Sequence, residues 1–245
     1  MDERLYRSLA RRGQLVKLDI SAHGLDIHPL EQPYDFPSLQ FLTLRGSLQK
    51  LTNVFPTLLA CSLLIVSIEV QDDSSRPEGD YGSLFHALQF PSLQRLAVYS
   101  TFMGPGSHPV SAKDTFPFLS HLVELRLFSL HINAETPTVE DAAIASIAPY
   151  WTRLERLFIT GITALAALPT TQSLALMARH CPALMTLILT IDPTTAPSTE
   201  IPLSNHGLET LDLHRTLIPY EIAARFVNNL RRLFPCADFV GGNWP

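Results

Sequence analysis

Two stretches of the chain, 36–46 and 90–100, share one pattern of apolar and polar positions. Each opens with Phe-Pro-Ser-Leu-Gln and continues with alternating apolar and polar residues. Such alternation predicts a half-buried β-strand, and the proline disfavours continuation of a preceding helix. Counted from the leucine of the opening phrase, the apolar positions are 1, 4 and 6: Leu39, Leu42 and Leu44 in one stretch, and Leu93, Leu96 and Val98 in the other. The chain therefore repeats a strand-bearing unit.

The same run, L-x-x-L-x-L with Ile or Val at some positions, occurs eight times in all. Its first leucine falls at residues 15, 39, 63, 93, 122, 154, 184 and 208, at intervals of 24 to 32 residues. In the fifth copy we align Leu122, Leu125 and Leu127 with positions 1, 4 and 6, and we place a degenerate ninth copy near Ala237. This regularity predicts strands that stack in chain order.

The segments between the copies predict helices and loops. Apolar residues three and four apart mark one face of each longer segment, with Thr138 as an expected N-cap and Pro219 ahead of the last helix. Helices are expected at 4–12, 83–89, 138–151, 171–181 and 220–234, and at 48–62 a helix split by Pro56. Exposed loops are expected at 71–82, 103–113 and 192–202, where Gly, Pro, Ser, Thr and Asp gather.

Alternating L-x-x-L-x-L runs and helices at this period resemble leucine-rich-repeat proteins of the ribonuclease-inhibitor-like type. The Phe-Pro-x-Leu phrase at Phe36, Phe90 and, more loosely, Phe116 is similar to the repeat region of fungal F-box proteins. The resemblance implies an α/β fold: a solenoid of about eight to nine repeats, with a curved parallel sheet on the concave side and helices and loops on the convex side. It also implies one array over 1–245, with a helical cap at 1–14, repeats at 15–218 and a C-terminal helix and cap at 219–245. An F-box itself is not found, so we expect either a fragment of a longer protein or a chain without the adaptor-binding part.

If positions 4 and 6 point into the core, positions 3, 5 and 7 point to the open face of the sheet. Stacking gathers Tyr, Phe and Arg there, which are residue types that dominate interface energetics. With the resemblance, this predicts a protein–protein interaction scaffold, the substrate-recognition repeat region of an F-box-type ubiquitin-ligase subunit, and the arginines favour an acidic client. The alternative is that loops cover these side chains or that they form solvated ion pairs. The candidate partner-binding residues are Phe41, Arg45, Arg95, Tyr99, Glu124, Arg126, Phe128, Arg156 and Phe158.

Composition narrows the classes of partner. The chain has 18 basic and 23 acidic residues, a net charge of −5, which argues against general binding of nucleic acid or anionic membranes. Its three cysteines fit no zinc or redox motif, and an odd count is a poor disulfide framework. Cys61 and Cys181 lie in apolar, helix-like contexts, so we expect these two to be buried thiols and the compartment to be reducing. Met1 is followed by the charged residues Asp2, Glu3 and Arg4 and not by the apolar region of a signal peptide, and no apolar run reaches membrane-spanning length. We expect a cytoplasmic or nuclear protein that binds a ubiquitin-ligase adaptor only if an F-box lies upstream.

The sequence lacks three common catalytic or phosphate-binding motifs. The chain has no G-x-S-x-G, H-E-x-x-H or G-x-x-x-x-G-K sequence. Three pairs deserve a structural check: His23 and His28 as metal ligands, His180 and Cys181 as a nucleophile pair, and Asp212 and His214 as part of a hydrolytic triad. We expect no catalysis, no metal and no cofactor. The alternative is a hydrolase-like enzyme whose site is built from loops 71–82 and 103–113.

Overall fold

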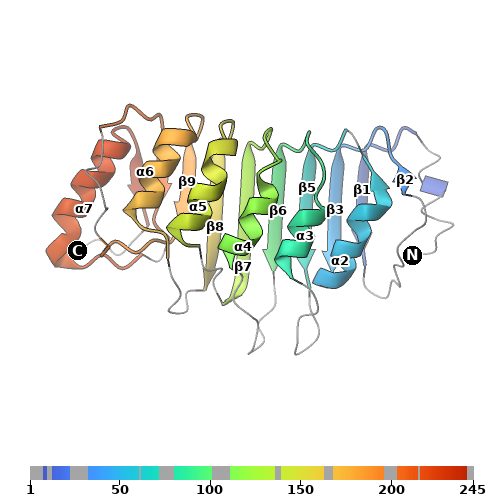
Figure 1. The fold of residues 1–245 in the computed structure, drawn as a ribbon, viewed down its shortest axis with the longest axis horizontal. Coiled ribbons are helices and arrows are strands. Elements are labelled where there is room, and N and C mark those ends of the chain that lie inside the picture. Colours follow the sequence, from blue (N-terminus) through green and yellow to red (C-terminus); the bar gives the residue numbers. More distant parts are fainter. Residues whose placement is uncertain are drawn as a thin grey trace.

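The computed structural model describes residues 8–9, 13–22, 33–60, 62–71, 80–100, 111–135, 139–162, 168–195, 203–214 and 216–241. Nine strands form one sheet in which every neighbouring pair is parallel and the spatial order follows the chain (Figure 1). These strands are β1 (Lys17–Ser21), β3 (Phe41–Gly46), β5 (Ile65–Val70), β6 (Arg95–Ser100), β7 (Leu127–Glu135), β8 (Arg156–Ile162), β9 (Thr186–Leu189), β10 (Thr210–Asp212) and β11 (Asp238–Val240). A small parallel pair, β2 (Tyr34–Asp35) and β4 (Leu58–Leu59), stands apart.

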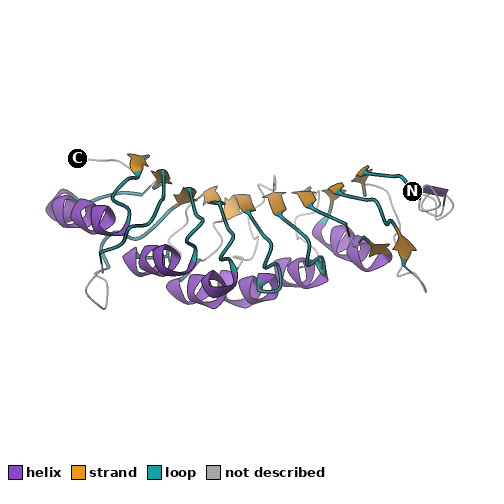
Figure 2. Cartoon of the chain, turned by 90° about the horizontal axis from the view of Figure 1, so that it is seen from above, coloured by secondary structure: helices purple, strands orange, loops and turns teal. Residues whose placement is uncertain are grey.

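Helices line one face of the sheet and leave the other without a described helix (Figure 2). They are α2 (Leu48–Val54), η1 (Phe55–Thr57), α3 (Tyr81–Ala87), α4 (Ala112–Thr115), η2 (Phe116–Leu119), α5 (Asp141–Ile147), η3 (Ala148–Tyr150), α6 (Thr171–His180) and α7 (Tyr220–Leu233), where η marks a 3₁₀ helix. Parallel strands need a crossover connection, and these helices supply it, all on the same side.

Most of the predicted helices are confirmed, with shifted boundaries. Helices α6 and α7 match the expected segments closely, and Pro56 does end the α-helical geometry after α2. Helix α5 begins at Asp141 after the N-cap residue Glu140, and the expected cap, Thr138, lies outside the described residues. Helix α3 begins two residues earlier than predicted because Asp80 caps it. Of the expected leading helix at 4–12, only residues 8 and 9 are described, and they are helical.

The core lies between the strands and the helices. In the first eight strands of the sheet, positions 4 and 6 face it and are almost fully buried, whereas Phe239 of β11 is partly buried. The position 4 residues pair across the sheet in one row: Leu18, Leu42, Val66, Leu96, Phe128, Leu157, Leu187, Leu211 and Phe239. One continuous apolar layer therefore joins the successive strands.

The predicted alignment of the fifth copy is wrong by three residues. Arg95 of β6 pairs with Leu127, so Leu125 occupies position 1 while Phe128 and Leu130 occupy positions 4 and 6. The pattern allowed both alignments because leucines at 122, 125 and 127 overlap a second apolar set at 125, 128 and 130. Packing selects the second because the Phe128 ring fills space between the sheet and the helices.

Backbone hydrogen bonds confirm this register independently. In most copies the position 2 carbonyl accepts bonds from two consecutive amides of the next copy. In the fifth copy that carbonyl belongs to Arg126, which accepts from the amides of Glu155 and Arg156 at 2.8 and 3.0 Å. Arg126 is therefore a position 2 residue, just before its strand, and its side chain does not belong to the rows at positions 3, 5 and 7.

A tight turn precedes most strands. The amide of the first leucine donates to the carbonyl three residues earlier, as from Leu93 to Phe90 at 3.0 Å and from Leu125 to Leu122 at 3.2 Å. The Phe-Pro-Ser-Leu phrase is one sequence that builds this turn. In the eighth copy a side chain takes the role of the carbonyl, since the Leu208 amide donates to Nδ1 of His206 at 3.0 Å.

Candidate functional site

We use the term open sheet face for the side chains at positions 3, 5 and 7 of the copies that contain strands β1, β3 and β5 to β10. The open sheet face lies on the side of the sheet opposite the helices (Figure 2). Six of the nine predicted partner-binding residues lie on it: Phe41, Arg45, Arg95, Tyr99, Arg156 and Phe158. The other three, Glu124, Arg126 and Phe128, do not.

The prediction for Phe128 is wrong because its side chain is buried in the core. It is 0% exposed, and its ring centroid lies 5.3 Å from Trp151, 6.0 Å from Phe116 and 6.3 Å from Phe85. Edge and tilted contacts of this kind are the preferred geometries of aromatic rings. Phe128 therefore holds helices α3, η2 and η3 against the sheet and cannot touch a partner.

Glu124 and Arg126 lie where the strands begin, and each is neutralised by a neighbouring copy. Glu124 pairs with Arg153, and Arg126 pairs with Glu155 at 3.1 Å. Both pairs are partly solvent-exposed, so each contributes at most about 1 kcal/mol. For Glu124 and Arg126 the structure therefore supports the alternative that these side chains form solvated ion pairs.

The corrected register places three other residues on the open sheet face. Leu127, Ser129 and His131 of β7 occupy positions 3, 5 and 7 between strands β6 and β8. The sequence carried no decisive signal for them. The first alignment puts Ser129 at position 8 and the second puts Ile132 there, and both kinds of residue are buried at that position in neighbouring strands, as Ser100 and Val70.

The N-terminal part of the open sheet face is self-neutralised. Arg45 of β3 donates two hydrogen bonds to Asp19 of β1, at 3.1 and 3.2 Å, and one to Glu69 of β5 at 3.1 Å. One guanidinium thus joins three strands whose residues are 24 to 26 positions apart in the chain. Since its donors face two carboxylates of this chain, Arg45 is less available to a partner than we expected.

The central part of the open sheet face differs in charge. Arg95, Leu127 and Arg156 occupy position 3 of β6, β7 and β8. Both arginines are exposed, and in the described part of the chain neither has an ion pair or hydrogen bond through its side chain. Two strand spacings separate their backbones, about 10 Å.

Aromatic and small side chains surround these two arginines. Tyr99 is 42% exposed, and its ring centroid lies 6.5 Å from that of His131. His131 Nδ1 lies 2.6 Å from the Thr160 hydroxyl, so the imidazole is held in place. Phe158 is half-buried. The result is a surface with aromatic groups beside two exposed guanidinium groups that have no ion pair within the described ranges, a combination suited to recognition.

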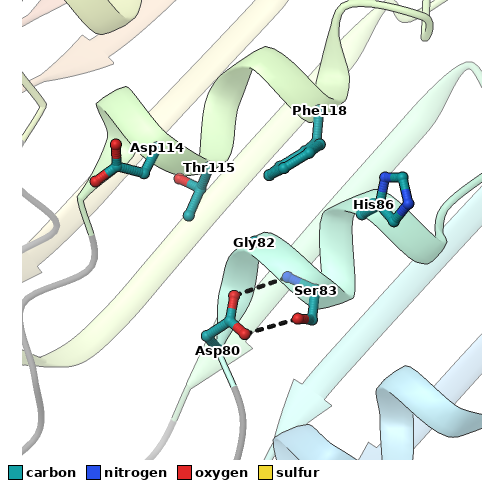
Figure 3. A pocket seen from close by; sticks show the side chains of 7 residues that line it. All are labelled: Asp80, Gly82, Ser83, His86, Asp114, Thr115 and Phe118. Atoms are coloured by element: carbon teal, nitrogen blue, oxygen red, sulfur yellow. Dashed lines mark hydrogen bonds between the residues drawn. The ribbon is translucent and has the colours of Figure 1, made fainter.

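The helix side carries an open depression of about 430 Å³ between α3 and the α4–η2 segment (Figure 3). Its lining residues are Asp80, Gly82, Ser83, His86, Asp114, Thr115 and Phe118. The Asp80 carboxylate turns toward Ser83 of its own helix, while His86 packs against Phe118 with ring centroids 5.2 Å apart. These polar groups therefore serve helix capping and packing, and their arrangement indicates no acid–base pair.

The capping role of Asp80 predicts a pH-dependent stability. Its Oδ1 accepts from the Ser83 amide at 2.8 Å and its Oδ2 from the Ser83 hydroxyl at 2.7 Å. The hydrogen bond from the Ser83 side chain is the main cause that lowers the pKa of Asp80 below its ordinary value of 3.8. A lowered pKa means that the stabilisation is complete above the unfolded-state value and is lost as pH falls through the folded-state value.

We expect Asp80→Ala to lower the free energy of unfolding by about 1 kcal/mol at pH 7, the usual effect of losing an N-cap. The difference from the wild type should shrink below pH 3.8 and vanish in stronger acid. Urea unfolding at pH 7, 5, 3 and 2 measures it, with Asp114→Ala as a control in the same depression. A difference that persists unchanged at pH 2 would contradict the capping role.

Cys181 is a buried structural thiol. Burial raises the pKa of Cys181 to about 12, and its Sγ lies 3.7 Å from the carbonyl oxygen of Ala148. A thiol that stays protonated at neutral pH is a poor nucleophile. The geometry therefore gives the pair of His180 and Cys181 no catalytic role.

We expect iodoacetamide at pH 8 to modify the exposed Cys236 in the folded protein and to leave Cys181 intact until the chain is unfolded. Peptide mapping by mass spectrometry separates the two sites. Equal modification rates in the native protein would show that Cys181 is accessible.

The remaining chemical pairs gain no support. No side-chain hydrogen bond joins Asp212 to His214 among the described residues, and the hydroxyl of Thr190 donates to the backbone carbonyl of His214. His23 and His28 lie outside the described residues, as do 72–79 and 101–110, most of the two loops of the enzyme alternative. Within the described ranges no three His, Cys, Asp or Glu residues are grouped in a way that could hold a metal ion.

Neither a scan against protein-family models nor a search of curated proteins finds a match to this chain. In the part of the chain that is described, no helix combines the length and the apolar character needed to span a bilayer.

Proposed function

We propose that the chain is a leucine-rich-repeat solenoid that acts as a protein–protein interaction scaffold. Three features support the repeat assignment: parallel strands in chain order, the turn that recurs before most strands, and described helices on one side of the sheet only. Such arrays use an extended sheet surface for binding. The observation that carries the function is the central open sheet face, where Arg95, Tyr99 and Arg156 are exposed.

Within this class we propose the substrate-recognition region of an F-box-type ubiquitin-ligase subunit in the cytoplasm or nucleus. The support is the Phe-Pro-x-Leu phrase that precedes the strands at Phe36 and Phe90. In this proposal the client occupies the open sheet face. Binding of a ubiquitin-ligase adaptor would require an F-box module outside the 245 residues.

Comparative affinity capture from the source cells tests the scaffold. Three baits are used: the wild type, Arg95→Ala/Tyr99→Ala on the open sheet face, and Arg179→Ala/Tyr150→Ala on the helix side as a control with matched residue types. Arg179 and Tyr150 are also exposed, so neither double variant removes a core contact. We expect client proteins to be captured by the wild type and the control, and to fall at least about tenfold with Arg95→Ala/Tyr99→Ala.

A client set that is the same for all three baits would contradict binding on the open sheet face. A client set lost equally with the helix-side control would do the same. Circular dichroism of the three baits checks that each is folded.

A further inference from the structure

The central open sheet face is basic, although the whole chain carries a net negative charge. The protein has a net charge of −5, yet positions 3, 5 and 7 of β6 to β9 include no carboxylate. They carry two arginines, one histidine and otherwise aromatic, aliphatic, small or hydroxyl side chains: Arg95, Ala97, Tyr99, Leu127, Ser129, His131, Arg156, Phe158, Thr160, Thr186, Ile188 and Thr190. A surface without carboxylates in an acidic protein points to an acidic ligand.

The two arginines are unusual among those near the sheet. Arg45, Arg126 and Arg153 each face a carboxylate of a neighbouring copy, at 3.1 Å for the first two. Arg95 and Arg156 have no such partner in the described ranges, although a guanidinium stays charged at any physiological pH. Their hydrogen-bond donors are therefore available for an incoming anion.

The distance between Arg95 and Arg156 indicates how far apart two negative charges of a ligand would lie. The two arginines lie two strands apart, about 10 Å between backbones, with the half-exposed Leu127 between them. In a polyproline II peptide, side chains three residues apart lie on the same side of the chain, about 9 Å from each other. In an extended β-strand, side chains two residues apart lie on the same side, about 7 Å from each other. Long flexible arginine side chains can meet either spacing.

We propose that Arg95 and Arg156 bind two carboxylates of an extended acidic peptide segment, spaced two or three residues apart, with an apolar side chain between them on Leu127. The segment crosses strands β6 to β8, and Tyr99 and Phe158 flank its path. This inference rests on the proposed scaffold function and specifies the chemistry of its client.

Single-stranded nucleic acid is the competing occupant, because arginine and exposed aromatics also suit it. The C-terminal end of the open sheet face disfavours it, because Asp212 of β10 lies there. The carboxylates of Asp19 and Glu69 at the other end are already bonded to Arg45. A continuous phosphate backbone would run toward the Asp212 carboxylate, whereas a short acidic segment ends before it reaches it.

The test is selection from a phage-displayed library of random twelve-residue peptides. The baits are the wild type, Arg95→Glu/Arg156→Glu, and Arg179→Glu/Arg231→Glu as a helix-side control with the same change of charge. We expect the wild type and the control to enrich peptides with acidic pairs around an apolar residue. The variant Arg95→Glu/Arg156→Glu, called the double reversal below, should no longer enrich these peptides and should enrich basic peptides instead.

The most enriched peptide is then synthesised and its affinity measured at 50 and 300 mM NaCl, with a twelve-nucleotide oligouridylate as a second probe. We expect binding of the peptide to weaken at least about tenfold in the double reversal, and to weaken with salt. Circular dichroism confirms that each variant is folded.

The inference is overturned if the selected peptides lack acidic pairs, if the double reversal binds the acidic peptide unchanged, or if the oligouridylate binds more tightly. Neutral peptides that lose binding in Tyr99→Ala would overturn the acidic client and leave the scaffold proposal standing. Peptide binding that no substitution on the open sheet face reduces would overturn both.

Discussion

Replacing Phe128 with alanine is expected to lower the free energy of unfolding by about 3 to 5 kcal/mol. Its side chain is 0% exposed and lies at the meeting point of three helical segments and the sheet. Truncation would leave a cavity lined by Phe85, Phe116 and Trp151, which cannot collapse without moving those elements. Urea unfolding followed by tryptophan fluorescence and circular dichroism measures the loss.

Phe41→Ala is the matched control, since it removes the same side chain from the open sheet face, where Phe41 is 37% exposed. We expect it to cost about 1 kcal/mol, the loss of a partly exposed ring. If Phe128→Ala cost no more than Phe41→Ala, the register of β7 would be in error and Phe128 would return to the candidate partner-binding set.

The second large effect is expected for the substitution His206→Phe, which should lower the free energy of unfolding by about 2 to 5 kcal/mol. The imidazole is buried and bonds two backbone groups: its Nε2 lies 2.8 Å from the Cys181 carbonyl oxygen, and its Nδ1 accepts from the Leu208 amide at 3.0 Å. Only the tautomer with the proton on Nε2 satisfies both. Phenylalanine keeps a ring against Phe234, 5.4 Å away, but leaves the buried Leu208 amide without this acceptor. The Cys181 carbonyl oxygen loses one donor and keeps the bond from the Leu184 amide at 3.0 Å.

The control is His86→Phe, because His86 is exposed on α3 and its ring contact with Phe118 survives the change. We expect its unfolding free energy to stay within about 0.5 kcal/mol of the wild type. Equal losses for the two variants would indicate that His206 contributes by ring packing and not by its two hydrogen bonds.

The candidate site was predicted in part. The alternation of apolar and polar residues placed Phe41, Arg95, Tyr99, Arg156 and Phe158 on the open sheet face without reference to contacts between copies. It could not show that Arg45 is held by Asp19 and Glu69, because the three residues come from different strands and meet only through the sheet register. Among the described residues, the same register brings no carboxylate to Arg95 or Arg156.

The amino-acid sequence by itself determined where the strands of the seven copies other than the fifth form, which side of each of these strands is apolar, and most of the helices between them. It did so because side chains alternate along a strand and recur every three to four residues along a helix. The tertiary structure alone decided which of two overlapping leucine sets in the fifth copy faces the core. Both sets satisfy the local period, and only the space that the Phe128 ring fills between the sheet and Phe85, Phe116 and Trp151 distinguishes them.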